Sequence, residues 1–153
     1  MYSKKEIEFI KEFINDRPDA KIFLGADSQR LKKKRTKFAT VIIVHYIDEN
    51  GQGKGAKIFT DVTYEKIIDA KLNRPFNRMM TEVNKLTEVY TLLEDVLIDR
   101  EFEIHLDISE QKEHGSNVAH GYAKGMIYGT IGVEPIFKPN AFAASSCADR
   151  YSK

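Results

Sequence analysis

The chain has little of several features that would assign it to a particular class of protein. It contains a single cysteine, Cys147, so it forms no internal disulfide and fits a reducing compartment. No stretch approaches the roughly 18 apolar residues that span a bilayer. The first residues, MYSKKEIEF, lack the apolar core of a secretory signal. We therefore expect a cytoplasmic protein with no membrane partner, while its oligomeric state stays open.

The chain also has almost no excess of positive over negative charge. The 24 Lys and Arg against 23 Asp and Glu give a net charge of +1, which does not by itself indicate a nucleic-acid-binding protein. Cations are nevertheless concentrated in one run, namely Lys32, Lys33, Lys34, Arg35 and Lys37. Such a run usually lies in a solvated loop, but here it follows a candidate site closely enough to touch a polyanion.

A glycine-rich phosphate loop is missing as well. The segment GADSQRLKKKR, which follows the first predicted strand, matches neither common nucleotide-binding fingerprint. This disfavours a nucleotide or phosphometabolite enzyme. The chain also has no internal repeat and no low-complexity segment.

What is present predicts one globular domain over residues 1–153. The length of 153 residues, 42% of them hydrophobic, suffices for one core and is short for two. Ser3-Lys-Lys-Glu6 is a capping box that starts an amphipathic N-terminal helix within residues 1–17. Strands are predicted at 20–28, 36–48 and 57–64, with turn residues at 49–55, and they should form an antiparallel meander.

The second half alternates between helices and strands. Helical periodicity over 78–97 is followed by a strand at 101–109, a helix at 116–129, a strand at 133–138 and a final helix. Gly121, Gly125 and Gly129 recur every four residues, which places them along one side of the 116–129 helix and permits very close packing there. Strands four and five follow helical crossovers, so they should lie parallel to a partner. The fold class is therefore α/β, a five-stranded mixed sheet flanked by helices.

Two aspartates end apolar strands, where a buried charge is unfavourable. Asp27 closes the strand AKIFLGADS and Asp107 closes EFEIHLDIS. If these strands are adjacent and parallel, both carboxylates reach the same carboxyl edge of the sheet, where open α/β sheets bind ligands. Aspartate is also common at strand ends and caps, and for either residue alone that simpler interpretation is favoured.

Two further acids lie on helices. At about 100° per residue, Glu82 falls inside the apolar stripe beside Leu86, whereas Glu88 projects from the opposite side. Asp149 lies near the end of the last helix, where the helix dipole disfavours a negative charge. For Glu82 the competing interpretation is a carboxylate that reaches water at the edge of the stripe. For Asp149 it is a solvated residue at the C-terminus.

Four carboxylates at one point need a compensating cation. At ~4 Å and an effective dielectric near 20, each pair costs about 4 kcal/mol. Oxygen ligands without a Cys or His cluster favour Mg²⁺ or Mn²⁺ over Zn²⁺. Two such ions activate a water and stabilise the leaving oxygen in phosphodiester cleavage. The hypothesis is a Mg²⁺- or Mn²⁺-dependent nuclease acting on DNA or RNA, with metal ligands and catalytic residues Asp27, Glu82, Asp107 and Asp149.

Four other polar residues are candidates for supporting roles. Ser28 and Gln29 are placed to donate hydrogen bonds to a phosphate or ribose, and Lys138 to contact a phosphate. His114, in a polar loop, is a candidate for proton transfer to the leaving group. The competing interpretation of Ser28 and Gln29 is a turn at the end of the strand. Lys138 could equally be a solvated lysine, and His114 a loop histidine without a specific role.

Several segments resemble the YkuK-type family of ribonuclease H-like proteins: GADSQ, TEV at Thr81, HLDIS, GSN, GYAKGM and the C-terminal KPNAFAASSCADRYSK. The resemblance runs from about Lys21 to the C-terminus. It implies a ribonuclease H-like fold with strand order 3-2-1-4-5, strand 2 antiparallel, and metal-dependent nuclease activity at the four acids named above. Because this fold also hosts resolvases, transposases, exonucleases and phosphotransferases, the alternative is a non-catalytic module that binds nucleic acid or protein.

Overall fold

The elements follow one another as helix, three strands, helix, strand and helices. A computed structural model describes residues 1–153 except 1, 48–49, 51–53, 70–74 and 112–113. The elements are α1 (Lys4–Asn15), β1 (Lys21–Arg30), η1 (Lys32–Lys34), β2 (Arg35–Ile47), β3 (Lys54–Lys66), α2 (Phe76–Leu97), β4 (Phe102–Leu106), η2 (Gly115–Ala119), α3 (His120–Ile131), η3 (Ala143–Ala148) and α4 (Asp149–Ser152). Most of the turn predicted at 49–55 lies outside the described residues.

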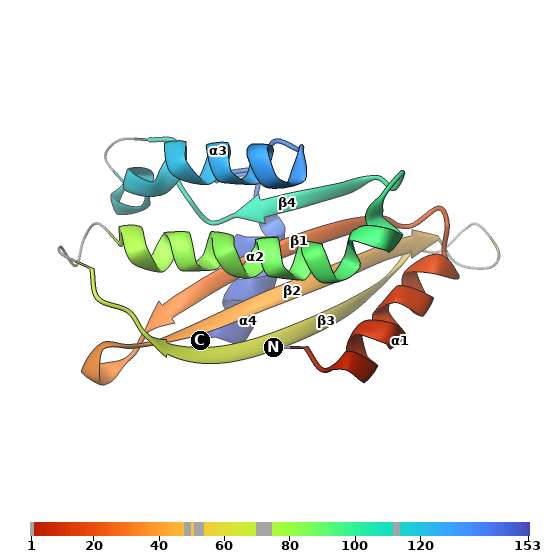
Figure 1. Cartoon of the computed structure of the whole chain (residues 1–153), viewed down its shortest axis with the longest axis horizontal. Helices are drawn as coiled ribbons and strands as arrows, with labels where there is room; N and C mark the ends of the chain where they lie inside the picture. Colours follow the sequence, from red (N-terminus) through yellow and green to blue (C-terminus); the bar gives the residue numbers. More distant parts are fainter. Residues whose placement is uncertain (1, 48–49, 51–53, 70–74, 112–113) are drawn as a thin grey trace.

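The strands form one mixed sheet in the order β3-β2-β1-β4. β1 pairs antiparallel with β2, and β2 pairs antiparallel with β3, as the meander predicted. β4 returns after α2 and pairs parallel with β1, from Ile22 opposite Phe102 to Ala26 opposite Leu106. The carboxyl ends of β1 and β4 therefore reach the same edge, beside the start of α2 (Figure 1).

The fifth predicted strand is wrong as a strand, because the described sheet has four strands. Its residues do lie beside β4, where Ile136 makes a single parallel bridge with His105. Leu106 donates its backbone N–H to the Ile136 carbonyl at 2.9 Å. The rings of Pro135 and Pro139 fix φ on either side of this contact, which limits its extension into a regular strand.

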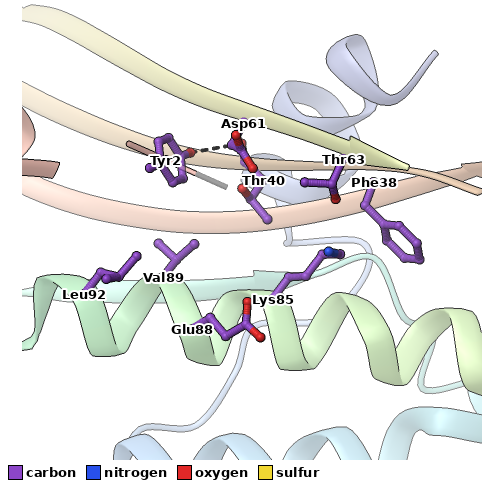
Figure 2. A pocket seen from close by; sticks show the side chains of 9 residues that line it. All are labelled: Tyr2, Phe38, Thr40, Asp61, Thr63, Lys85, Glu88, Val89 and Leu92. Atoms are coloured by element: carbon purple, nitrogen blue, oxygen red, sulfur yellow. Dashed lines mark hydrogen bonds between the residues drawn. The ribbon is translucent and has the colours of Figure 1, made fainter. Parts of the chain in front are cut away.

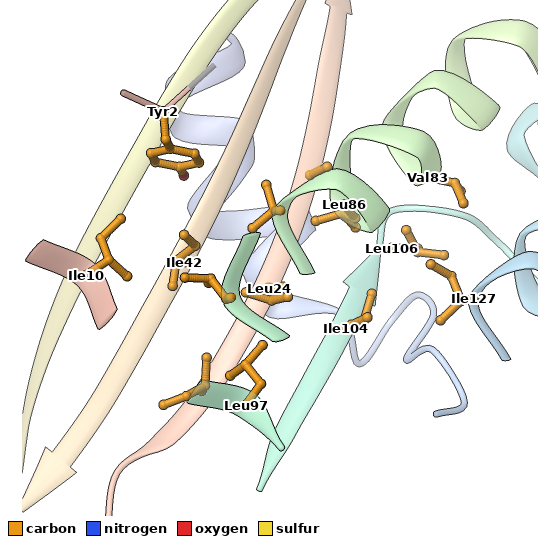
Figure 3. Close-up of a cluster of buried hydrophobic side chains, with 14 of the residues drawn as sticks. Tyr2, Ile10, Leu24, Ile42, Val83, Leu86, Leu97, Ile104, Leu106 and Ile127 are labelled. Atoms are coloured by element: carbon orange, nitrogen blue, oxygen red, sulfur yellow. The ribbon is translucent and has the colours of Figure 1, made fainter. Parts of the chain in front are cut away.

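Helices cover both faces of the sheet. α1, α2 and α3 lie on one face, whereas η3 and α4 lie on the other (Figure 1). The alternation of β1 places Leu24 in the larger core under α2 and Phe23 in a smaller core under the C-terminal helices. Figure 3 shows the larger core, in which Leu24, Ile42 and Leu86 are fully buried.

Gly25 allows the C-terminal helical segment to approach the sheet closely. A Cβ at Gly25 would lie 2.5 Å from both the carbonyl carbon and the oxygen of Ala143. The backbone N–H of Ala143 donates to Nδ1 of the buried His105 at 3.1 Å. Burial lowers the pKa of His105, and its Nε2 lies 3.0 Å from Glu103 Oε2. These contacts tie η3 to β1 and β4 and so determine where the following residue, Asp149, lies.

The glycines of α3 do not have the predicted role. A Cβ at Gly121, Gly125 or Gly129 would meet nothing within 4 Å. α3 instead packs through its opposite side, where Ala123 and Ile127 are fully buried. A small-residue spacing allows close packing, but the larger apolar side chains gain more by burial.

The N-terminal helix begins as predicted. Ser3 Oγ accepts from the Glu6 N–H, and Glu6 Oε2 accepts from the Ser3 N–H, each at 3.1 Å. Before the helix, the buried Tyr2 hydroxyl lies 3.2 Å from each of two strand carbonyls, those of Thr40 and Phe59.

Among the helices described, none has the length and apolar composition to cross a membrane.

Candidate active site

A cleft of about 670 Å³ opens at the carboxyl edge of β1 and β4. Three of the four predicted acids line it: Asp27 in β1, directly after the last residue that pairs with β4, Asp107 just after β4, and Asp149 at the start of α4. Its other lining residues are Ser28, Pro75, Arg78, Met79, His114, Gly115, Ser116 and Lys138. The parallel pairing of β1 with β4 brings the two strand-end aspartates together, as carboxyl ends of adjacent parallel strands must.

Asp27 is the most tightly enclosed acid of the cleft wall, with an exposed fraction of 7%. Ser152 Oγ donates to Asp27 Oδ2 at 2.8 Å. The pKa of Asp27 is raised from 3.8 to about 6, chiefly by burial; the charges of Asp107 and Asp149 also raise it, whereas the hydrogen bond from Ser152 lowers it. The three carboxylates therefore interact electrostatically across the cleft.

Glu82 lies beneath the cleft rather than on its wall and is fully buried. Ser28 Oγ donates to Glu82 Oε1, while Arg78 Nη1 donates to Ser28 Oγ at 2.9 Å and to Ser28 O at 2.8 Å. Glu82 Oε2 is buried without a hydrogen-bond partner among the described residues. Burial, followed by the charge of Asp27, raises the pKa of Glu82 well above its usual range.

Lysine side chains compensate the other two acids. Lys138 Nζ lies 3.2 Å from Asp107 Oδ1, and Lys153 Nζ lies 2.8 Å from Asp149 Oδ2. In the part of the chain that the structure describes, no three His, Cys, Asp or Glu side chains form a ready-made metal-binding group. The acids share one cleft, each with its own hydrogen-bonding or charged partner.

The predicted supporting residues are distributed unevenly. Lys138 and His114 line the cleft, and His114 Nδ1 lies 2.7 Å from Ser109 Oγ. Ser28 also lines the cleft, but its hydroxyl is already engaged by Glu82 and Arg78. Gln29 is exposed and is not part of the cleft wall.

Sequence reasoning missed three residues of the site: Arg78, Ser152 and Lys153. Arg78 precedes Glu82 by four residues, so one turn of α2 places both on the same side of the helix. Ser152 reaches Asp27 across 125 positions of sequence. The helical spacing could have indicated Arg78, whereas no local signal indicates the contact of Ser152.

A second hollow elsewhere in the molecule contains none of the four predicted acids. It lies between α2 and strands β2 and β3, where Tyr2, Thr40, Lys85 and Val89 contribute to its wall (Figure 2). Its volume of about 30 Å³ holds about one water molecule. The cleft beside Asp27 is therefore the better candidate for a substrate site.

The architecture defines an α/β protein with a carboxylate-lined cleft at the edge where its parallel strands end. A family model described as "Ribonuclease H-like" matches residues 5–153. The chain therefore belongs to the ribonuclease H-like family, which confirms the resemblance found in its sequence. Comparison with curated proteins and with solved structures gives no significant match.

Proposed function

We propose that this protein is a divalent-metal-dependent nuclease that hydrolyses phosphodiester bonds of DNA or RNA with two Mg²⁺ or Mn²⁺ ions. One observation carries the proposal: Asp27, Asp107 and Asp149 come from separate parts of the chain and line a single cleft. Burial, and to a smaller extent the charges of Asp107 and Asp149, raise the pKa of Asp27, so holding this carboxylate in the cluster works against folding at neutral pH. A cluster that opposes folding is typical of a functional site.

The donor set fits a hard divalent cation. Every candidate ligand is a carboxylate oxygen, the type that Mg²⁺ and Mn²⁺ prefer. Asp27, Asp107 and Asp149 would hold the ions from the cleft wall. Glu82, whose Oε2 is buried without a partner among the described residues, would contribute from beneath. Once bound, the two ions supply activation of a water and stabilisation of the leaving oxygen.

Side chains around the acids account for binding and proton transfer. Hydrolysis forms a bond from the water oxygen to phosphorus, with loss of one water proton to solvent, and breaks the bond to the leaving oxygen, which takes up a proton. His114 lines the cleft and is the candidate donor of that proton. Lys138, beside Asp107, would neutralise a non-bridging phosphate oxygen. Arg78 fixes the Ser28 backbone next to Asp27.

The test is cleavage of single-stranded, duplex, hybrid and branched oligonucleotides with Mg²⁺ or Mn²⁺. Asp27→Asn and Asp107→Asn should each lower the rate by about 100-fold or more. Asp19→Asn, an exposed substitution before β1, should leave it unchanged. Cleavage that persists in EDTA would overturn the proposal. Binding of nucleic acid without cleavage of any substrate would instead favour a non-catalytic binding module.

A further inference from the structure

The connection between β1 and β2 carries an unusual concentration of free positive charge. Lys32, Lys33 and Lys34 form the turn η1, all three are exposed, and within the described residues none of their ammonium groups has an ion-pair partner. Lys33 and Lys34 adopt left-handed backbone conformations, with φ of 57° and 61°. Non-glycine residues adopt this conformation uncommonly, and three adjacent like charges repel one another. Among the described residues, no ion pair offsets the repulsion between these three charges.

The charged turn is tied to the same end of the molecule as the cleft. Lys34 O accepts from the Ile67 N–H at 3.2 Å. Two residues further, the Asp69 carboxylate accepts from the Asn77 N–H, directly before Arg78 of the cleft wall. In Figure 1 the β1–β2 hairpin projects past the start of α2, at the edge to which β1 and β4 point.

The distance from the cleft to the turn is set by the strand. Lys32 is five residues beyond Asp27, and at about 3.3 Å per residue it lies roughly 16 Å away at most. A double helix rises about 3.4 Å per base pair, so this distance corresponds to about five base pairs. One straight duplex can therefore contact both the cleft and the turn.

The cleft wall offers no surface for stacking bases. Among the described residues that line it there is no Phe, Tyr or Trp, and the cations are Arg78 and Lys138. Proteins that hold single strands commonly stack the bases on aromatic side chains. Besides its three carboxylates, the wall offers Arg78, Lys138 and serine hydroxyls, which suit contacts to the phosphate backbone of a duplex, whose bases are already stacked on one another.

We propose that Lys32, Lys33 and Lys34 bind the phosphate backbone of double-stranded nucleic acid within about five base pairs of the phosphate held in the cleft. This inference rests on the proposed function, which it extends by assigning a duplex substrate and a second contact surface. The contact is electrostatic and independent of base sequence. DNA, RNA and hybrid duplexes share the chemistry, so all three are compared in the test.

The experiment measures binding of fluorescent 20-base-pair duplexes and their single strands by anisotropy in EDTA, over a series of salt concentrations. The triple variant Lys32→Gln, Lys33→Gln, Lys34→Gln should weaken duplex binding about tenfold or more and reduce the salt slope by up to about 2.7, or 0.9 per lost contact. The charge-matched control Lys4→Gln, Lys5→Gln, Lys124→Gln removes exposed cations elsewhere and should have a much smaller effect. Replacing the three turn lysines with arginine should preserve binding.

Each outcome bears on the inference. Equal losses in the turn variant and the control would overturn the contact surface, and equal affinity for single strands would overturn the duplex assignment. Absence of nucleic-acid binding by the wild type would overturn both. If the wild type cleaves nucleic acid but the turn variant binds duplexes as well as the wild type, the proposed function stands and this inference fails. If duplex binding depends on the turn but no metal-dependent cleavage is found, the contact surface is supported and the proposed function fails.

Discussion

Replacing Asp27 with asparagine should stabilise the metal-free protein at neutral and alkaline pH. The pKa of Asp27 rises from 3.8 to about 6 on folding, chiefly because the carboxyl is buried. The folded state therefore binds this proton more tightly than the unfolded state. The resulting stability is fully present below pH 3.8 and is lost as the pH rises toward and through 6.

The structure gives the size of the effect. A difference of about 2 pKa units corresponds to about 3 kcal/mol of lost stability above pH 6. Asparagine has no charge to bury, and its carbonyl oxygen can still accept from Ser152 Oγ. The pKa of about 6 already includes the hydrogen bond from Ser152, and asparagine resembles the neutral carboxyl, so the expected net gain at pH 8 is about 3 kcal/mol. For a chain of this length, that gain raises the Tm by roughly 6 to 12 °C.

The assay is urea unfolding in EDTA at pH 4, 6 and 8, comparing the wild type with Asp27→Asn. The gain should be largest at pH 8 and close to zero at pH 4. Asp19→Asn is the control, because Asp19 is exposed and its replacement should change stability by less than about 0.5 kcal/mol at each pH. A variant no more stable than the wild type at pH 8, or a gain independent of pH, would refute the account of Asp27 as a carboxylate held at a cost.

Three further predictions concern the C-terminal packing, the N-terminus and the metal. Gly25→Ala should cost about 1–3 kcal/mol in urea unfolding because its Cβ would clash with Ala143, whereas Gly121→Ala, which meets open space, should be neutral or stabilising by up to about 1 kcal/mol. Tyr2→Phe should cost about 1 kcal/mol in the same assay because its hydroxyl contacts two strand carbonyls. Mg²⁺ or Mn²⁺ should raise the Tm of the wild type in thermal unfolding, and Asp107→Asn should raise the metal-free Tm while abolishing this response.

Each of these three predictions has a result that would contradict it. Equal effects of Gly25→Ala and Gly121→Ala would show that close approach of the C-terminal segment to β1 is not needed. An unchanged stability in Tyr2→Phe would mean that water replaces both hydroxyl contacts. A metal response that survives in Asp107→Asn would remove Asp107 from the proposed metal ligands.

Much of the architecture was predictable because it is encoded by local patterns. The capping box at Ser3, the continuous apolar run of β1 and the alternation of β4 each identified an element from its own residues. The fifth strand was mispredicted because Pro135 and Pro139 limit pairing over a segment whose composition otherwise favours strand. The glycine spacing of α3 was misleading because spacing describes a surface without saying what packs against it.

In the candidate site, too, some residues were predictable from local patterns and others were not. The sequence by itself determined that charged residues interrupt apolar patterns at Asp27, Glu82 and Asp107, because local periodicity identifies the face on which each side chain lies. Only the tertiary structure decided that Asp149 lies in one cleft with Asp27 and Asp107. It also decided that Glu82 lies beneath this cleft and that Ser152 hydrogen-bonds to Asp27. Those contacts depend on how the C-terminal helices cross the sheet, and no local pattern encodes contacts between residues 125 positions apart.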